Sequence, residues 1–394
     1  MPSDRAPRCI CYAFTGGGTG GHIFPGLAVA GEFRKKITDG ASSARRPPSA
    51  ARIVWIGSSR GMDRDLVEKS GKADRFYGIP SGKLRRYISF RTIPDIFRVL
   101  AGFFSAVFLL VKLKPAFLFS KGGYVSVPPC FAAKLLGIPV FTHECDFSPG
   151  LATRLNSRAA SRVFVSYEGT RDFFPVDARE RIVVTGNPVR AEFYEADALR
   201  GRELLGIPAA PSKPVLLALG GSSGSQQINA LVRETLPRLT EHFVVIHQTG
   251  YNTENDAPFA HCLSDAGHSY IAFPFIHEGM CDVIAASDVV VSRAGANSLS
   301  ECAALKKPLV LIPLSGAGTR GDQVENAEFY AKNNAAIALS GGVTAQAFTA
   351  ALETMLDAAK RAEFSRNIAA LAGDKRPAKV IAEILCGAEK GTKV

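Results

Sequence analysis

The run Thr15-Gly16-Gly17-Gly18-Thr19-Gly20-Gly21-His22 combines groups that could hold a phosphate with one that could move a proton. It follows an apolar segment typical of a strand, residues 9–14, and precedes a segment typical of a helix, residues 24–37. Glycines let the backbone approach a ligand closely, and the start of a helix offers unpaired N–H groups and positive partial charge to an anion. Histidine exchanges protons near neutral pH. The run predicts an anion site with a candidate general base, although any tight strand-to-helix turn uses similar glycines.

The same run contains the dinucleotide spacing Gly16-x-Gly18-x-x-Gly21, which requires an acidic residue at the end of the second strand. That strand, residues 52–57, continues into Ser58-Ser59-Arg60 and meets no carboxylate before Asp63. A nicotinamide site is therefore disfavoured.

A second glycine loop, Gly220-Gly221-Ser222-Ser223-Gly224-Ser225, follows an apolar strand at residues 215–219. Neither loop is followed by the lysine of a P-loop, because His22 follows the first and Gln226 follows the second. A sugar attached to a nucleoside diphosphate fits two such loops better than a nucleoside triphosphate.

Strand-like and helix-like segments alternate along the chain in two series. Strands are expected near residues 9–14, 52–57, 116–120, 139–142, 162–166 and 182–185, and again near 215–219, 243–248, 289–292 and 309–312. This alternation predicts two doubly wound parallel sheets whose glycine-rich strand ends meet at a cleft. The proline-containing segment 186–213 is typical of a linker, so the expected domains are 1–190 and 191–394, with the last helix packing back on the first domain.

Composition excludes several classes of protein. The 394 residues are 46% apolar and 21% charged, enough for two packed cores. The eight cysteines form no CxxC pair, which indicates buried thiols in a reducing cytoplasm, and residues 1–8 lack the apolar core of a signal peptide. The net charge of +11 could suit nucleic acid, but no nucleic-acid-binding motif accompanies it, and no such partner is expected.

The positive charge gathers beside an apolar segment. Residues 83–98 hold five basic side chains against Asp95, and residues 99–111 are thirteen positions without a charge, whereas a membrane-spanning helix needs about twenty. The segment is expected either to be a core helix or to lie on an anionic lipid surface without crossing it. The candidate membrane contacts are Arg85, Arg86, Arg91, Phe97, Phe103 and Phe104.

Seven motifs in order complete a family pattern. They are Gly17-Gly18-Thr19-Gly20-Gly21-His22, Lys121-Gly122-Gly123-Tyr124-Val125-Ser126, His143-Glu144, Gly186-Asn187-Pro188-Val189-Arg190, Gly220-Gly221-Ser222, Ser292-Arg293-Ala294-Gly295-Ala296 through Ser300-Glu301, and Asp322-Gln323 with Asn326-Ala327. Together they closely resemble the MurG family of glycosyltransferases. Residues 38–51, which look like a flexible loop, and residues 252–266 match nothing in that pattern.

The resemblance implies a GT-B fold of two Rossmann-like domains and an inverting transfer of N-acetylglucosamine from UDP-N-acetylglucosamine. The implied acceptor is the 4-hydroxyl of N-acetylmuramic acid in lipid I, the undecaprenyl-pyrophosphoryl-MurNAc-pentapeptide, and the product is lipid II for peptidoglycan. The first domain would bind the acceptor and the second most of the donor. The family also implies a peripheral protein on the cytoplasmic face of the bacterial cell membrane, a role in cell wall biogenesis, cell shape and division, and no cofactor.

Donor contacts follow from the same resemblance. They are Thr19, Gly20, Gly21, Asp146, Arg190, Ser222, Ile276, Ala296, Asn297, Ser298, Leu299, Ser300, Glu301 and Gln323. Arg190 and Ser222 would lie near the diphosphate, Ile276 would meet the uracil through its backbone, and Gln323 would bind the sugar. Glu301, expected at the start of a helix, would accept hydrogen bonds from the ribose hydroxyls.

Direct displacement needs a base for the acceptor hydroxyl and a way to stabilise departing UDP. His22 is the first candidate base, and helix dipoles with Arg190 would take the place of a metal. The family's His-Glu-Gln-Asn is His143-Glu144-Cys145-Asp146 here. Asp146 could accept from sugar hydroxyls, compete with His22 as base or raise its pKa. His143-Glu144 is no HExxH zinc motif, because Phe147 stands at the second histidine position.

Two alternatives stay open at the level of sequence. One is another enzyme of the same fold, either a sugar-nucleotide epimerase or a lipid glycosyltransferase with a different acceptor. The other is a noncatalytic nucleotide-sugar binding protein.

Overall fold

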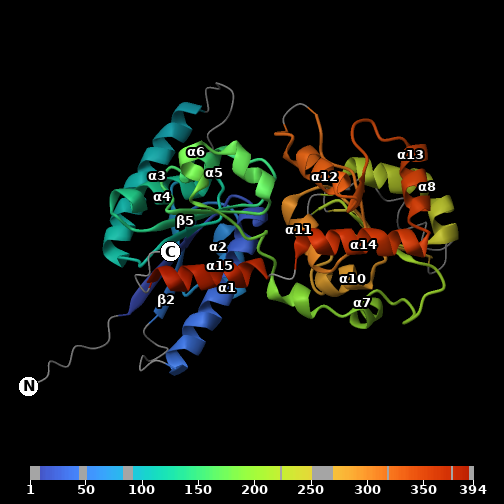
Figure 1. Cartoon of the computed structure of the whole chain (residues 1–394), viewed down its shortest axis with the longest axis horizontal. Coiled ribbons are helices and arrows are strands. Elements are labelled where there is room, and N and C mark those ends of the chain that lie inside the picture. Colours follow the sequence, from blue (N-terminus) through green and yellow to red (C-terminus); the bar gives the residue numbers. More distant parts are fainter. Residues whose placement is uncertain are drawn as a thin grey trace, which may run out of the picture. The chain divides into compact units, whose positions relative to one another are not determined.

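The computed structural model describes residues 9–43, 51–82, 92–221, 224–250, 269–316, 319–373 and 376–389. The chain forms two compact units (Figure 1). The first contains the chain up to Arg190 and the segment that carries the last helix, and the second begins at Ala191 and ends before that helix. Each unit is an α/β structure around its own parallel sheet.

The first sheet has seven strands in the order β3-β2-β1-β4-β5-β6-β7. They are β1 (Ile10–Thr15), β2 (Ala51–Ser58), β3 (Arg75–Ile79), β4 (Leu118–Ser120), β5 (Val140–Glu144), β6 (Arg162–Val165) and β7 (Ile182–Val184). Every neighbouring pair is parallel. The direction of winding reverses at β1, which pairs with both β2 and β4. Ligands of such sheets bind outside the strand ends at this switch point.

Helices cover both faces of this sheet. They are α1 (Gly20–Ser43), α2 (Asp63–Ser70), α3 (Thr92–Leu113), α4 (Val127–Leu135), α5 (Leu151–Asn156), α6 (Val176–Arg179) and α15 (Pro377–Glu389), with 3-10 turns η2 (Tyr124–Ser126) and η3 (Glu168–Phe173). Side chains alternate along β1: Tyr12 and Phe14 pack with α1 and α15, whereas Cys11 and Ala13 pack with α3 and α4. This alternation produces two cores, one on each side of the sheet.

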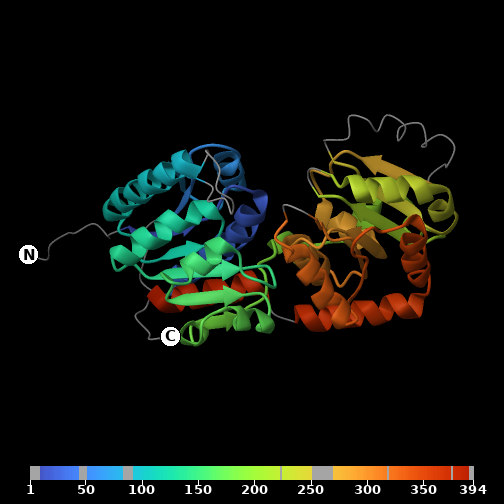
Figure 2. The same ribbon diagram turned by 90° about the horizontal axis from the view of Figure 1, so that it is seen from above.

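The last helix belongs to the first unit although the entire second unit precedes it in the chain. α15 lies beside α1 (Figure 1), and the view from above shows this red helix among the elements of the first unit (Figure 2). Its apolar face, Ala378, Ile381, Ala382 and Leu385, is buried with the aromatic side chains of β1 and β4.

The second sheet has six parallel strands in the order β10-β9-β8-β11-β12-β13. They are β8 (Val215–Leu219), β9 (Val244–Gln248), β10 (Tyr270–Phe273), β11 (Val289–Ser292), β12 (Leu309–Leu311) and β13 (Ala336–Ala338). The helical elements are η4 (Ala191–Glu195), α7 (Ala198–Leu204), α8 (Gln226–His242), α10 (Met280–Ala286), α11 (Ala296–Ala304), α12 (Asp322–Lys332), α13 (Ala345–Thr354) and α14 (Ala358–Ala372). Here the switch point is β8, which pairs with β9 and β11.

The predicted class of two doubly wound parallel sheets is confirmed, and each predicted strand corresponds to an observed one. Three strands were missed, β3, β10 and β13, and all three are edge strands. Their sequences are short and lack the long apolar runs of central strands. The helix predicted at 24–37 extends from Gly20 to Ser43, so residues 38–43 are helical rather than loop. Residues 44–50 and 252–266 lie outside the described residues.

Candidate active site

The first glycine run lies at the switch point of the first sheet, between the end of β1 and the start of α1. Gly18 adopts a φ of +85°, and a Cβ there would lie 2.5 Å from Cε1 of Tyr124, so only glycine fits. Below the loop, the indole Nε1 of Trp55 donates to the carbonyl of Gly16 at 3.0 Å. Trp55 and Tyr124 therefore both restrict the position of the loop.

Asp63 braces the same loop. Its carboxylate accepts the Gly18 N–H at 2.9 Å and the Ser58 N–H at 2.9 Å, and the residue is 1% exposed. Burial raises the pKa of Asp63, and the bonds from the Ser58 and Gly18 amides oppose that rise. Asp63 thus positions the loop. This role was not predicted from the sequence, where Asp63 is only the first carboxylate after β2. The signal that could have found it is a carboxylate at the start of the helix that follows β2.

His22 lies in the first turn of α1, and its ring packs against the loop that follows β4. A Cβ on Gly123 would lie 2.9 Å from Cδ2 of His22, and Gly123 has a φ of +79°. The structure therefore brings together two motifs about a hundred residues apart, because β1 and β4 are neighbours in the sheet.

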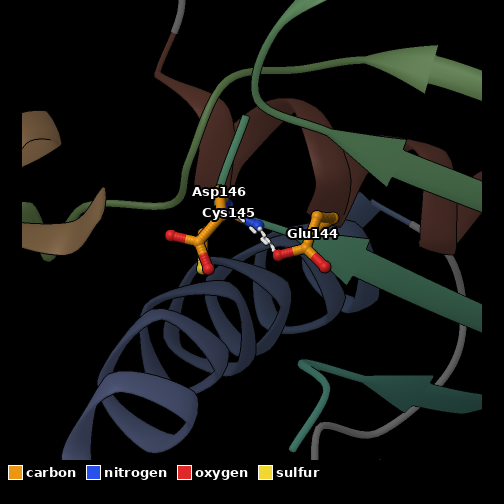
Figure 3. A group of neighbouring side chains, drawn as sticks. All are labelled: Glu144, Cys145 and Asp146. Carbon is orange, nitrogen blue, oxygen red and sulfur yellow. Dashed lines mark hydrogen bonds between the residues drawn. The ribbon is translucent and has the colours of Figure 1, made fainter. Parts of the chain in front are cut away.

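Glu144 is the last residue of β5, the next strand along, and Cys145 and Asp146 follow it directly, so the three side chains lie close together (Figure 3). The Glu144 carboxylate accepts the backbone N–H groups of Cys145 at 2.9 Å, Asp146 at 3.1 Å and Gly150 at 2.9 Å. Burial raises the pKa of the Cys145 thiol to about 12. A carboxylate already bonded to three amides and a protonated thiol make a poor metal-ligand set, so Glu144 shapes the turn.

Asp146 is presented by that turn. Its carboxylate points away from Glu144 (Figure 3), and its side chain is half-buried at the same sheet edge as His22. Its backbone N–H is held by Glu144, which fixes the direction of the side chain.

His143 is a second histidine near this edge, but its surroundings differ from those of His22. It is fully buried on β5, and its Nε2 lies 3.0 Å from the carbonyl of Gly186, to which it donates. Burial lowers the pKa of His143 well below its usual value, and the nearby Lys121 ammonium lowers it further. His143 is therefore a neutral structural residue. Of the two histidines near this edge, His22 is the candidate for the general base.

The other donor contacts expected in the first unit lie near the start of α1. Thr19 is exposed, Gly20 and Gly21 begin the helix, and the Arg190 guanidinium stacks 5.4 Å above the ring of Phe24. Arg190 is thereby held beside the first turns of α1, which also carry His22.

The second glycine loop lies at the switch point of the second sheet. Ser222 is outside the described residues, but the loop after it is held, because Arg293 donates to the carbonyl of Gly224 at 2.8 Å. Ser225 caps α8 by accepting the N–H of Ile228 at 3.3 Å. The loop therefore opens onto the N-terminus of a long helix, as an anion site requires.

Residues Ala296 to Glu301 form most of α11. Ala296 and Leu299 are buried, so neither side chain is exposed to a ligand. Glu301 lies in the second turn rather than at the start of the helix, which corrects the expected placement. Asn326 steadies the turn before α11 by donating to the carbonyl of Ala294 at 3.1 Å.

Gln323 and Ile276 are each held by one described bond. Gln323 lies in the first turn of α12, and its Oε1 accepts the N–H of Leu314 at 3.0 Å, so its amide nitrogen remains a donor. The N–H of Ile276 donates to Oε1 of Gln248 at 3.0 Å. Gln248 was missed at the sequence level, since nothing in a β-strand ending His247-Gln248 marks it.

α3 carries the apolar surface expected to meet a membrane. Exposed fractions reach 67% for Phe97, 68% for Phe104 and 74% for Phe108. Phe103 is half-buried and packs against the first unit's core, whereas Phe108 was not anticipated. Arg85, Arg86 and Arg91 lie outside the described residues.

By length and composition alone, the stretch Pro94–Leu113 of α3 could cross a membrane. The prediction that the segment is too short to span was therefore wrong, because it counted only the uncharged residues 99–111. Ala106 and Leu110 are nevertheless buried in the core beside α4, so one face of α3 is packed within the first unit.

Family models match both halves of the chain. The glycosyltransferase family 28 N-terminal domain matches residues 12–165, and the family 28 C-terminal domain matches residues 215–383. The chain is 47% identical over 393 residues to the UDP-N-acetylglucosamine--N-acetylmuramyl-(pentapeptide) pyrophosphoryl-undecaprenol N-acetylglucosamine transferase of Treponema denticola, covering 95% of this chain and 97% of the relative. It is 49% identical over 331 residues to the transferase of the same name from Treponema pallidum strain Nichols, covering 84% of this chain and 82% of the relative.

Solved structures share the fold. The crystal structure of Acinetobacter baumannii MurG aligns with a TM-score of 0.70 at 23% identity, covering 96% of this chain and 99% of that one. The UDP-GlcNAc 2-epimerase from Methanocaldococcus jannaschii aligns with a TM-score of 0.64 at 14% identity, covering 96% and 99%. At these identities the likeness concerns the fold alone, so the sequence relatives discriminate between transferase and epimerase.

Proposed function

The chain belongs to glycosyltransferase family 28 and, within it, to the UDP-N-acetylglucosamine--N-acetylmuramyl-(pentapeptide) pyrophosphoryl-undecaprenol N-acetylglucosamine transferases; we therefore propose that it transfers N-acetylglucosamine from UDP-N-acetylglucosamine to lipid I, forming lipid II for peptidoglycan. The observation that carries the proposal is the 47% identity that spans 95% of this chain and 97% of the relative. Family 28 models match both the N-terminal and the C-terminal half of the chain.

The second unit binds most of the donor. The glycine loop after β8 and the N-terminus of α8 receive the diphosphate, with Ser222 in the loop. The backbone of Ile276 meets the uracil, Glu301 accepts from the ribose hydroxyls, and the Nε2 of Gln323 donates to the sugar. From the first unit, Thr19, Gly20, Gly21 and Arg190 add donor contacts, the guanidinium as a bidentate partner of phosphate oxygens.

His22 acts as general base in the first unit. The acceptor 4-hydroxyl oxygen attacks C1 of N-acetylglucosamine on the face opposite the phosphate, and its proton passes to the imidazole of His22. The bond between C1 and the phosphate oxygen breaks as the new bond forms, which inverts the anomeric centre and releases UDP. N–H groups at the glycine loops and the Arg190 guanidinium take up the charge that develops on UDP.

Asp146 supports this chemistry by accepting from a hydroxyl of donor or acceptor. Its support comes from position: the turn after β5 presents it at the sheet edge where α1 begins. Glu144 is excluded from that role because its oxygens are bonded to backbone amides.

The exposed face of α3 rests on an anionic membrane surface, so the protein is peripheral, at the cytoplasmic face of the cell membrane where its lipid-linked acceptor is found. Three exposed phenylalanines at helical spacing on a helix whose other face is packed support contact in the plane of the interface.

UDP release from UDP-N-acetylglucosamine by the full chain, with and without a lipid I analogue, tests the proposal. We expect acceptor-dependent release, with kcat reduced by about 10²- to 10⁴-fold in His22→Ala while the Kd for UDP stays within about twofold. His242→Ala, an exposed histidine at the end of α8, is the matched control and should behave as wild type. Donor binding without release in the presence of acceptor would refute the transferase, and a fully active His22→Ala would refute the base.

A further inference from the structure

Gln248, the last residue of β9, is bonded to two backbone segments of the second unit. Its Oε1 accepts the N–H of Ile276 at 3.0 Å, and its Nε2 donates to the carbonyl of Gly221 at 3.4 Å. The residue is 3% exposed. Under the proposed function, Ile276 meets the base and the loop that contains Gly221 receives the diphosphate. One buried carboxamide thus joins the two parts of the nucleotide site.

The backbone around Gln248 is fixed on both sides. The next two residues donate to the segment before Ile276: Thr249 N to Phe273 O at 2.9 Å, and Gly250 N to Pro274 O at 2.9 Å. On the other side, Asn229 of α8 donates to the carbonyl of Thr249 at 2.9 Å. The carboxamide therefore extends from a rigid strand end, and its position sets that of its partners.

The bond to Ile276 is the stronger of the two. A distance of 3.0 Å lies at the usual length for N–H···O, whereas 3.4 Å lies beyond it. Because Ile276 is buried, losing Gln248 would leave its N–H without this acceptor, and the segment would shift to satisfy it.

We propose that Gln248 is a positioning residue for base recognition: it holds the backbone of Ile276 where that backbone selects uracil over other bases. The inference rests on the proposed function and deepens it. Uracil and cytosine have the same shape, but uracil presents an N3–H donor where neutral cytosine presents an acceptor nitrogen. Because the Ile276 N–H is bonded to Gln248, the Ile276 carbonyl is the group that accepts from this N3–H. A correctly placed peptide group separates the two bases by hydrogen bonding alone, so the ratio of CDP to UDP dissociation constants reports its position.

The test is equilibrium binding of UDP and of CDP to the full chain, with kcat measured at saturating donor. In Gln248→Met, an unbranched side chain without the carboxamide, we expect UDP to bind about tenfold more weakly, CDP to change less than twofold, and the CDP/UDP ratio to fall about tenfold. The kcat at saturation should change less than twofold, since the reacting atoms are not touched. Gln346→Met, at an exposed position on α13, is the matched control.

Gln248→Glu provides the rescue. A carboxylate still accepts from Ile276 but cannot donate to Gly221, and its charge opposes the diphosphate. We expect UDP and CDP to weaken by the same factor, so the wild-type ratio returns.

Unchanged UDP binding in Gln248→Met overturns the inference, as does an equal loss for UDP and CDP, which a merely structural role produces. If Gln248→Met lowers the melting temperature more than Gln346→Met does, the Gln248→Glu variant decides. A CDP/UDP ratio that falls in Gln248→Glu overturns the inference, and a ratio equal to that of wild type supports it. A wild-type chain that binds no UDP refutes the proposed function itself. A wild-type chain that binds UDP more tightly than CDP, with Gln248 variants that keep the same CDP/UDP ratio, refutes only the inference about Gln248.

Discussion

Three carboxylates at the carboxyl edge of the first sheet have different roles because their neighbours differ. Asp63 holds the glycine run, and Glu144 holds the turn after β5, each through backbone N–H groups. Asp146 is carried by the turn that Glu144 fixes. Residue type alone would have made all three candidates for the chemistry.

Among single residues, Asp146 gives a direct prediction. Asp146→Ala should lower kcat, or raise KM for donor or acceptor, by about tenfold, because a sugar hydroxyl loses its acceptor. Asp146→Asn, which keeps the size and one acceptor oxygen and restores the family's amide, should stay within about threefold of wild type. Steady-state kinetics with both substrates provides the measurement. An alanine variant with wild-type kcat and both KM values would remove Asp146 from the site.

His247 predicts how the second unit responds to acid. It is buried on β9 between Asn229 and Tyr270, and burial lowers its pKa to about 4. The unfolded chain takes up this proton near pH 6.5 whereas the folded chain does not, so stability present above pH 6.5 is lost as pH falls towards 4. With about 1.4 kcal/mol per pKa unit, the full loss is about 3 kcal/mol.

Thermal unfolding of wild type and His247→Gln between about pH 7 and 4.5 checks this. The stability difference between the two proteins should narrow as the pH falls, because glutamine does not titrate. His242→Gln, at an exposed histidine, is the control for replacing a histidine by glutamine at the surface. If the difference in stability between wild type and His247→Gln stayed constant across this pH range, protonation of His247 would not be coupled to unfolding.

Among the helices, α3 is divided between two environments. Ala106 and Leu110 pack into the core, while Phe97, Phe104 and Phe108 point outward at spacings of a helical face. An exposed apolar stripe of this kind marks an interaction surface in a folded protein.

Replacing Phe97, Phe104 and Phe108 together by serine should reduce binding to phosphatidylglycerol vesicles more than about tenfold, since burying one phenylalanine stabilises binding by about 1.5–3 kcal/mol. UDP binding should not change. Leu199→Ser with Leu204→Ser, exposed leucines on α7, controls for lost apolar surface. Vesicle sedimentation that is the same for the triple variant and wild type would exclude α3 as the contact.

Across the chain as a whole, the first unit is discontinuous in sequence. α15 completes a core that β1, β4 and α1 begin, so this core is closed only by a helix that follows the entire second unit. Lys36 of α1 and Glu383 of α15 add a surface ion pair at 2.7 Å.

Ile381→Ala and Leu385→Ala should each destabilise the first unit by about 2–5 kcal/mol, because each leaves a cavity beside the aromatic side chains of β1 and β4. Amide hydrogen exchange should show lost protection in α1 and β1 and unchanged protection in β8 and α8. Glu383→Ala, on the exposed face of α15, should cost less than about 1 kcal/mol. Equal loss of protection in both units would contradict the assignment of α15 to the first.

Features that are local in the chain could be predicted before the fold was known. Alternating strand and helix patterns predicted two parallel doubly wound sheets, and glycine runs between strand and helix located the loop at the switch point of each sheet, because backbone preference and side-chain periodicity act over a few residues. Motif order indicated the family. The glycine run made His22 a candidate base, and the departure from the family's His-Glu-Gln-Asn made Asp146 a candidate contact.

Contacts between distant segments could not be predicted in this way and came from the folded chain. The pairing of β1 with β4 places His22 against Gly123, and the return of α15 closes the first core. The bonds of Asp63 to Gly18 and of Gln248 to Ile276 join residues 45 and 28 positions apart. Such contacts depend on strand order and register, which are set by packing of the whole chain, and no local pattern of residues specifies them.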